Sequence, residues 1–478
     1  MSAGNFRGSA VFPKCPAGRG GAAGNETKMR RLLRILLPVA TLVALALPSA
    51  AAAETAIAPA RGFAPRQLLV KFEGQQVGRA LSLPPGARVR RTAEALRRNP
   101  DVVYAEPNYV APASATVGDP FDPNDPGTLG EASGAATDSG DWAYKQWNFL
   151  SPEGPASAEL PISPGGIDAP HAWRNLIDAG RPGGAGVVVA VLDTGIAYRS
   201  FGSGFRRSPD FGPGQFVPGY DFVDRDRLPL DENGHGTHVA GTIAEKTDNG
   251  FGLAGLAYRA KLMPVRVLDS QGRGNALEIA KGIRFAIANQ AQVINMSFNF
   301  ACRKRVPLVD EALREAYEAG IVTVGSAGNL GSEGCVSAPA TGPRVIAVGG
   351  TTEGACLGSY SLAGSTIDLV APGGGTPRVG CPSVSSRPIY QVTLRPGSTG
   401  EFAIPADYVG TSMAAAHVSG AAALVLASRA VKPKLKGRTR VEAVTKRLRQ
   451  TARDLGLPAI QQGAGLLDVG KATTPVPR

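Results

Sequence analysis

A few residues of this 478-residue chain have the types and the setting that amide hydrolysis requires. That reaction needs a nucleophile, a base that takes its proton, a group that orients the base, and hydrogen-bond donors for the oxyanion. Histidine is the scarcest of these types, because the chain contains only His171, His235, His238 and His417. If the base is a histidine, it is therefore one of these four.

His235 is the strongest candidate base. It lies in NGHGTH, residues 233–238, where two glycines allow a tight entry into a helix predicted over 238–245. The spacing differs from the H-E-x-x-H of zinc sites, and no carboxylate separates the two histidines, so a zinc site is disfavoured. We expect His171 at a helix start on the surface and His417 packed inside a helix.

Two further candidates follow predicted strands. Asp193 ends the apolar run 187–192, and Asn329 follows the run 321–324. Open α/β sheets place their sites at the carboxyl ends of the strands. Asp193 can therefore orient a base, and the Asn329 amide can donate to an oxyanion, although each residue taken alone also fits an ordinary turn.

Ser412 lies in GTSMA, residues 410–414, just ahead of an Ala-rich helix. A serine at a helix start gains from the helix dipole, and its own backbone N–H can bind an oxyanion. Taken alone it also fits a helix N-cap. The G-x-S-x-G motif is absent, which disfavours an esterase or lipase of the α/β-hydrolase type.

The elements that must position these residues alternate along the chain. Continuous apolar runs are typical of buried parallel strands, and here they are separated by helical stretches. The runs are at 187–192, 261–268, 293–296, 321–324 and 345–348, and the helices at 238–245, 276–288 and 308–318. We predict a three-layer α/β/α fold with a mostly parallel sheet. A small α+β unit precedes it, with strands at 67–72 and 101–105 and a helix at 91–98.

Charge is unevenly distributed over the chain. The formal net charge is +12, but residues 113–428 carry 23 basic and 30 acidic side chains, and residues 429–453 carry 10 and 1. The body is therefore mildly acidic, and we interpret 429–453 as a solvated basic face. No nucleic-acid partner is expected. With 43% hydrophobic and 19% charged residues, the chain is predicted to be globular.

The N-terminal part has the features of a secretory signal peptide. A basic start precedes an apolar run at 35–47 and an A-x-A site at 51–53. We assign 29–53 to the signal peptide and leave 1–28 as an uncertain N-terminal extension. The run is too short for a good membrane span, so no membrane partner is expected after cleavage.

The chain contains five cysteines and no CxxC pair, which excludes a zinc ribbon or a thioredoxin motif. Cys15 lies apart from the other four. Neighbourhood in the sequence favours Cys302–Cys335 and Cys356–Cys381, while other pairings and free buried thiols stay open.

Taken together, five stretches resemble the subtilisin-like serine proteases. They are VAVLDTGI at 189–196, NGHGTHVAGTIA at 233–244, VINMS at 293–297, VGSAGN at 324–329 and GTSMAAAHVSG at 410–420. The resemblance covers about residues 140–470. It implies that Asp193 orients the base, His235 is general base and then general acid, Ser412 is the nucleophile, and Asn329 is the oxyanion donor.

The same resemblance implies several further features. Gly272, Arg273 and Gly274, with Ser297, Phe298 and Asn299, would pair with an extended substrate. Arg273 would favour acidic residues two or more positions before the cut. Asn299-Phe300 stands where two glycines are common and would narrow or reshape the pocket for the residue that precedes the cut. Residues 247–250 resemble a calcium loop, with the metal ligands left unassigned and a solvated loop as the open alternative. Ala338–Pro339 would be a cis peptide.

The resemblance also implies the organisation of the precursor. Residues 54–113 would be an inhibitory propeptide, 114–140 a linker, and 141–478 the catalytic domain, with the maturation site between Val110 and Gly140. We therefore expect a secreted serine endopeptidase that acts on proteins or peptides as a self-processed monomer and needs no cofactor for its chemistry. A catalytically dead scaffold of the same fold is the alternative from another class.

Overall fold

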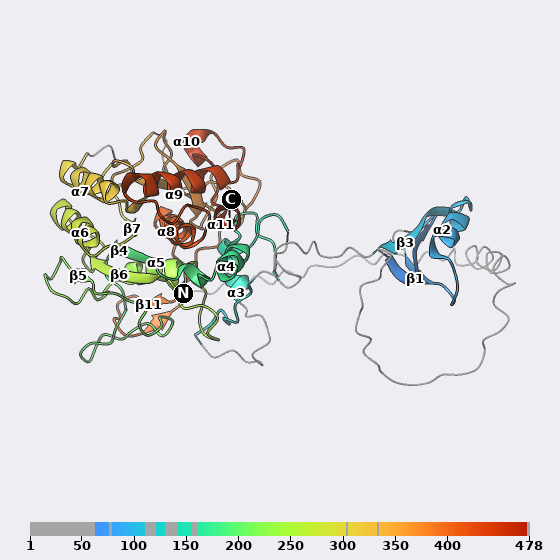
Figure 1. Ribbon diagram of the computed structural model, residues 1–478, viewed down its shortest axis with the longest axis horizontal. Coiled ribbons are helices and arrows are strands. Elements are labelled where there is room, and N and C mark those ends of the chain that lie inside the picture. Colours follow the sequence, from blue (N-terminus) through green and yellow to red (C-terminus); the bar gives the residue numbers. More distant parts are fainter. Residues whose placement is uncertain are drawn as a thin grey trace, which may run out of the picture. The chain divides into compact units, whose positions relative to one another are not determined.

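The computed structural model describes residues 63–75, 79–109, 121–129, 142–154, 160–302, 305–331 and 334–475 (Figure 1). The chain forms two compact units, Met1–Ala113 and Ser114–Arg478, and each is described by itself. The predicted signal peptide at 29–53, the extension at 1–28 and Cys15 lie outside the described residues.

The smaller unit is a three-stranded antiparallel sheet with one helix. Its elements are β1 (Phe63–Phe72), β2 (Arg79–Ser82), α2 (Val89–Arg97) and β3 (Val102–Tyr109), with strand order β2-β1-β3. Leu68 and Val70 of β1 pack against Val89 and Ala93 of α2. The predicted helix and two predicted strands are present, and β2 was missed because its four residues are all exposed.

The larger unit is built on a seven-stranded sheet with the order β10-β9-β8-β7-β4-β6-β5. All pairings within it are parallel. The strands are β4 (Val188–Asp193), β5 (Tyr220–Asp221), β6 (Lys261–Arg266), β7 (Val293–Met296), β8 (Val322–Ser326), β9 (Ile346–Thr351) and β10 (Leu369–Pro372). A two-stranded ribbon, β11 (Thr393–Leu394) and β12 (Phe402–Ala403), lies outside this sheet.

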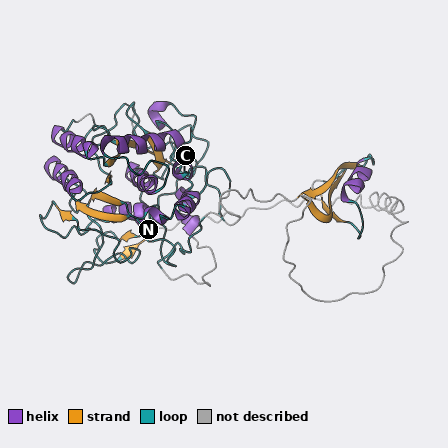
Figure 2. Cartoon of the chain, viewed as in Figure 1, coloured by secondary structure: helices purple, strands orange, loops and turns teal. Residues whose placement is uncertain are grey.

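Helices cover both faces of the sheet, as Figure 2 shows. Val189 and Val191 point to a layer that contains α4 (Ala169–Asp178), α5 (His235–Ala244) and α8 (Thr411–Ala427). Ala190 and Leu192 point to the opposite layer, formed by α6 (Ala276–Ala288) and α7 (Pro307–Glu318). The alternation of buried side chains along one strand thus gives the predicted three layers, and the fold prediction is confirmed.

Shorter helical segments and one long helix complete the larger unit. They are α3 (Trp142–Lys145), η1 (Trp147–Phe149), η2 (Pro182–Gly184), α9 (Gly437–Thr451), α10 (Ala459–Gln462) and α11 (Val469–Thr473). Helix α9 carries part of the basic run. Arg438 forms an ion pair with Glu318, and the Arg447 guanidinium donates to carbonyls around the end of α11. Part of this face therefore fastens neighbouring segments instead of being wholly solvated.

Part of the predicted linker packs within the larger unit. Gly127 N donates to Gly252 O at 2.9 Å, and Trp142 N donates to Asp125 O at 3.1 Å. Asp125 itself is fully buried. Residues 121–129 are therefore bonded structure, although their Pro- and Gly-rich composition predicted a linker through residue 140.

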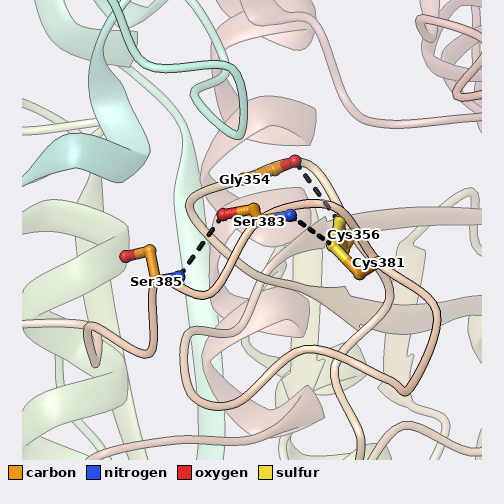
Figure 3. The surroundings of a disulfide bond; sticks show 5 residues. All are labelled: Gly354, Cys356, Cys381, Ser383 and Ser385. Carbon is orange, nitrogen blue, oxygen red and sulfur yellow. Dashed lines mark hydrogen bonds between the residues drawn. A yellow bond between two sulfur atoms is a disulfide. The ribbon is translucent and has the colours of Figure 1, made fainter.

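Two disulfides and a cis peptide were expected, and all three are present. Cys302 is bonded to Cys335 and Cys356 to Cys381, and the Ala338–Pro339 peptide is cis. Figure 3 shows the second disulfide, where Ser383 N donates to Cys381 Sγ at 3.3 Å. It ties the loop after β10 to the segment after β9. No helix in the described part of the chain is long and apolar enough to cross a membrane.

Candidate active site

Asp193 is the last residue of β4 and is fully buried. Because β4 lies between β6 and β7, its carboxyl end opens in the middle of the sheet. One carboxylate oxygen, Oδ1, accepts hydrogen bonds from Thr194 N at 2.8 Å and from His235 Nδ1 at 2.7 Å. The backbone and the imidazole together therefore hold this carboxylate in one orientation.

His235 begins α5, directly after Gly234, whose φ is +102°. Gly236, the residue after His235, has no room for a side chain, because a Cβ there would lie 2.1 Å from Gly195 O. Glycine at these two positions lets the helix start approach the end of β4 closely enough for the Asp193 contact. The His235 side chain stays 26% exposed, so its other ring nitrogen can meet a substrate.

The pKa of His235 is raised above that of an ordinary histidine. Burial acts against this, because it disfavours the imidazolium and lowers the pKa. The negative charge of Asp193 and its hydrogen bond outweigh burial, and the charge of Asp231 adds to them. The site therefore stabilises the protonated base that forms when a nucleophile gives up its proton.

Asp231 supports the same helix start, and the sequence analysis missed it. Its carboxylate is fully buried and accepts five hydrogen bonds. The donors are Thr194 Oγ1, the backbone N–H groups of Asn233, Gly234 and Thr237, and Thr237 Oγ1. An aspartate just before a helix is a capping signal, which could have identified this residue.

Ser412 is the second residue of α8 and is 8% exposed. Its Oγ donates to Ser297 O at 3.0 Å, and Ser297 Oγ donates to Ser412 O at 2.8 Å. Asn295 Nδ2 in turn donates to Ser297 Oγ at 2.9 Å. This reciprocal contact fixes the peptide of Ser412 against the end of β7, whose strand neighbour is β4.

Asn329 follows β8 and reaches the residue before Ser412. Its Oδ1 accepts from Thr411 N at 2.9 Å and from Thr411 Oγ1 at 2.8 Å. Because the oxygen takes both bonds, the Nδ2 end is the one left to donate elsewhere. A Cβ on Gly410 would lie 2.9 Å from that Nδ2, so glycine at 410 keeps space beside it.

The two predicted substrate edges differ in exposure and in their backbone contacts: Gly272–Gly274 is exposed, whereas Ser297 of the second edge is buried. Arg273 N donates to Asp269 Oδ1 at 2.9 Å, and Asp269 N donates to Arg273 O at 2.8 Å. The backbone of Arg273 is thus engaged in a closed turn, and an incoming strand that pairs with Gly272–Gly274 would have to displace part of it.

The second edge, Ser297–Asn299, is tied across to β8. Asn299 Nδ2 donates to Ser326 O at 2.5 Å, and Ser326 Oγ donates to Asn299 Oδ1 at 3.1 Å. Phe298 O lies 3.5 Å from the same hydroxyl. The side chain of Asn299 therefore links the ends of the neighbouring strands β7 and β8.

The other three histidines have partners of their own. His417 is buried, with Nδ1 2.8 Å from Met413 O and Nε2 2.8 Å from Asn148 Nδ2, which confirms the packed core residue. His238 is buried and stacks on Tyr408 at 4.0 Å. Burial lowers the pKa of His238 to about 3 and that of His417 to about 4. His171 lies at the start of α4, half-buried, 2.6 Å from Asp168.

A separate group of buried carboxylates surrounds the loop at 247–250. Asp125 accepts from Asp248 N and Asn249 N, each at 3.0 Å. Asp210 accepts from Asn249 Nδ2 and Leu253 N, each at 2.9 Å. Burial raises the pKa of Asp125 to about 7 and that of Asp210 to about 8. No Lys, Arg or His of the described residues lies within 4.0 Å of either carboxylate.

The fit of this group to calcium is partial. Oxygen donors are the ligands that Ca²⁺ takes, and two buried carboxylates without a cation match its charge. Within the described ranges, however, no set of three or more His, Cys, Asp or Glu side chains is arranged to hold a metal. Any calcium ion here would therefore depend on amide and backbone oxygens of the loop as well.

Comparison with known proteins agrees with this arrangement. A model of the "Subtilase family" matches residues 184–466. A thermophilic serine proteinase from Bacillus sp. (strain AK1) is 34% identical over 337 residues, which cover 70% of this chain and 66% of that protein. Thermitase from Thermoactinomyces vulgaris is 34% identical over 275 residues, 58% of this chain and 85% of thermitase.

A solved structure supports the same relation. A protease from Pseudoalteromonas arctica matches with a TM-score of 0.56 and 30% identity, covering 74% of this chain and 99% of that one. The fold, the named relatives and the site geometry together define a serine endopeptidase. The chain belongs to the subtilase family, the subtilisin-like serine proteases.

Proposed function

We propose that Asp193, His235 and Ser412 form the catalytic triad, and that Asn329 Nδ2 and Ser412 N bind the oxyanion. The observation that carries the proposal is the buried 2.7 Å contact between Asp193 Oδ1 and His235 Nδ1. It supports the tautomer with a proton on Nδ1, which leaves Nε2 free to act as the base.

Each step then follows from these groups. His235 Nε2 takes the Ser412 hydroxyl proton while Oγ attacks the substrate carbonyl carbon, and the carbonyl oxygen becomes the oxyanion. When the carbon–nitrogen bond breaks, His235 gives the proton to the leaving amine. Water then repeats the sequence on the acyl-enzyme and releases the acid. Asp193 accepts the Nδ1 proton's hydrogen bond throughout and stabilises the imidazolium.

The resting hydroxyl must rotate before the first step. Its single proton points to Ser297 O in this structure. Catalytic hydrogen bonds commonly tighten only in the substrate complex. A bound substrate whose scissile carbonyl oxygen occupies the space beside Asn329 Nδ2 would favour the Ser412 rotamer that faces His235.

We also propose that the protein is made as a secreted, self-processing precursor and that the catalytic unit acts as a monomer. The described part of the smaller unit, residues 63–75 and 79–109, would act as the intramolecular inhibitor. Support comes from the signal-peptide features of 29–53 and from the division of the chain after Ala113. A calcium ion would be held by Asp125, Asp210 and the loop at 247–250, and its charge would neutralise the two buried carboxylates.

The intact mass of the exported protein, wild type beside Ser412→Ala, tests the proposal. We expect loss of the N-terminal region in the wild type alone, and a fall in casein hydrolysis of about 10⁶-fold, the loss known for subtilisin itself. Wild-type turnover in Ser412→Ala would refute the mechanism. Equal processing of both proteins would refute self-cleavage only.

Two controls separate the alternatives. A fluorophosphonate reacts only with an activated serine, so absence of labelling in the wild type would favour a catalytically dead scaffold. Turnover of short esters without turnover of casein would favour an esterase.

A further inference from the structure

A hollow on the larger unit is lined by none of the candidate catalytic residues. It has a volume of about 620 Å³ and lies between the edge strand β5 and the C-terminal half of α6. Three aromatic side chains and three cations line it: Tyr220, Phe222, Phe285, Arg225, Arg227 and Lys281. We refer to it as the β5–α6 hollow.

The cations that line this hollow form no ion pair with another described residue. Among the described residues, no ion pair or side-chain hydrogen bond engages Arg225, Arg227 or Lys281, and all three are exposed. The carboxylates that alternate with the arginines face other groups. Asp224 Oδ2 lies 2.7 Å from Arg266 Nη1, and Asp226 Oδ1 accepts from Leu228 N at 2.7 Å.

The turn that carries the arginines is fixed. Asp221 N donates to Asp226 O at 3.0 Å, and Asp226 N donates to Asp221 O at 3.2 Å. Arg225 within this turn has a φ of +62°, a left-handed conformation that is unfavourable for a non-glycine residue. The fixed turn therefore holds positive side chains over the hollow.

The floor of the hollow is a cluster of rings. The ring centroids of Tyr220 and Phe222 are 4.7 Å apart, and Phe285 lies 5.8 Å from Tyr220 and 6.0 Å from Phe222. All three side chains are partly exposed. An apolar floor below a positive rim, in a hollow of this size, is the composition of a ligand site.

We propose that the β5–α6 hollow is an accessory site that binds acidic segments of polypeptide substrates. The occupant follows from charge complementarity: the rim has three unpaired cations, and no acidic side chain lines the hollow. The inference rests on the proposed function, because the bound segment is part of a chain to be cleaved. Rim charges act mainly on association, so the site would lower KM for acidic proteins and leave kcat unchanged.

Direct binding tests the site without catalysis. In the Ser412→Ala protein, fluorescence anisotropy would follow a labelled short peptide of glutamates and phenylalanines. We expect Arg225→Glu/Arg227→Glu to weaken binding about tenfold or more, since two attractive contacts become repulsive. Arg259→Glu/Arg314→Glu is the matched control: it makes the same charge change at exposed positions that do not line the hollow.

The outcomes distinguish this inference from the proposed function. Equal weakening in both double variants, or no binding at all, overturns the accessory site. Displacement of the peptide by inorganic phosphate, but not by chloride at equal ionic strength, also overturns it, because the hollow would then be a simple anion site. In the catalytically intact chain, the hollow variant should hydrolyse a short neutral peptide normally and show a raised KM only for the acidic substrate. Failure of the wild type on the neutral peptide refutes the proposed function instead.

Discussion

Asp193 and Asp231 lie around the start of α5, whereas Asp125, Asp210 and Glu245 lie around the loop at 247–250. Both groups are buried carboxylates of one unit. In the first group, His235 lies within hydrogen-bond distance of Asp193 and can become positive, while Asp231 acts on His235 through its charge alone. In the second group no described residue forms an ion pair with the carboxylates, and the charge of Lys246 only partly offsets burial at Asp125 and Asp210. Burial followed by the charge of Asp210 raises the pKa of Glu245 well above its usual value.

The two groups show that buried carboxylates have different roles according to whether a titrating cation lies beside them. A carboxylate that is hydrogen-bonded to a titrating histidine stabilises the cation that the reaction creates. Carboxylates that share a buried site without a cation stabilise each other only when one takes up a proton or an external cation arrives. The first group is therefore suited to chemistry and the second to a response to pH or calcium.

The largest expected effect comes from removing the charge of the first group. Asp193→Asn should lower kcat by about 10⁴-fold, because an amide favours the wrong tautomer of His235. Asp468→Asn is the matched control, since Asp468 is also a buried carboxylate, caps α11, and does not touch His235. Equal kcat values for Asp193→Asn and the control would contradict the assignment.

Calcium should act on the second group alone. At a concentration about 100 times its Kd, Ca²⁺ would stabilise the fold by about 2.7 kcal/mol and raise the Tm, and a chelator would reverse this. Melting curves of the wild type and of Asp125→Asn/Asp210→Asn, with calcium and with chelator, would measure the effect. An unchanged calcium response in the double variant would exclude these carboxylates as ligands.

The pH dependence of activity sharpens the assignment of the first group. Only neutral His235 can accept a proton, and its pKa is raised above the ordinary value. Activity should therefore fall with decreasing pH at a higher pH than a histidine of about 6.5 would give. A pH profile of kcat/KM would show this acidic limb. An apparent pKa of this limb below about 6.5 would mean that burial outweighs the charge of Asp193.

The smallest effect concerns stability and pH in the second group. The pKa of Asp210 is raised by burial to about 8, so folding is unaffected by this group below about pH 4 and becomes less favourable as pH rises toward 8. With calcium chelated, Asp210→Asn should gain in Tm relative to the wild type between pH 5 and pH 8. A difference that stays constant across this range would show that Asp210 does not titrate there.

The sequence predicted the elements that carry strong periodic signals. The runs before Asp193 and Asn329 are buried strands, and the helix predicted over 276–288 matches α6. The helix at 238–245 begins earlier than predicted, at His235, because the glycines that indicate a turn also permit a helix start. The two-residue β5 is too short to give any alternation.

Contacts between distant residues were beyond the sequence analysis. Asp125 lies in a Pro- and Gly-rich stretch and meets Asp248 and Asn249 more than 120 residues later. Nothing in the local pattern indicates that contact, so the loop at 247–250 was left without carboxylate ligands. The engaged backbone of Arg273 likewise depends on the side chain of Asp269, which a resemblance to a family does not determine.

Helix α8 carries Ser412 at its start and is buried from Thr411 through Val425. It packs against β7, β8, β9 and β10, so it can open only when most of the sheet opens. Its amide hydrogens should therefore exchange with deuterium at the rate set by global unfolding. Hydrogen exchange and heat inactivation would then report the same event, and the enzyme would lose its nucleophile only by losing its fold.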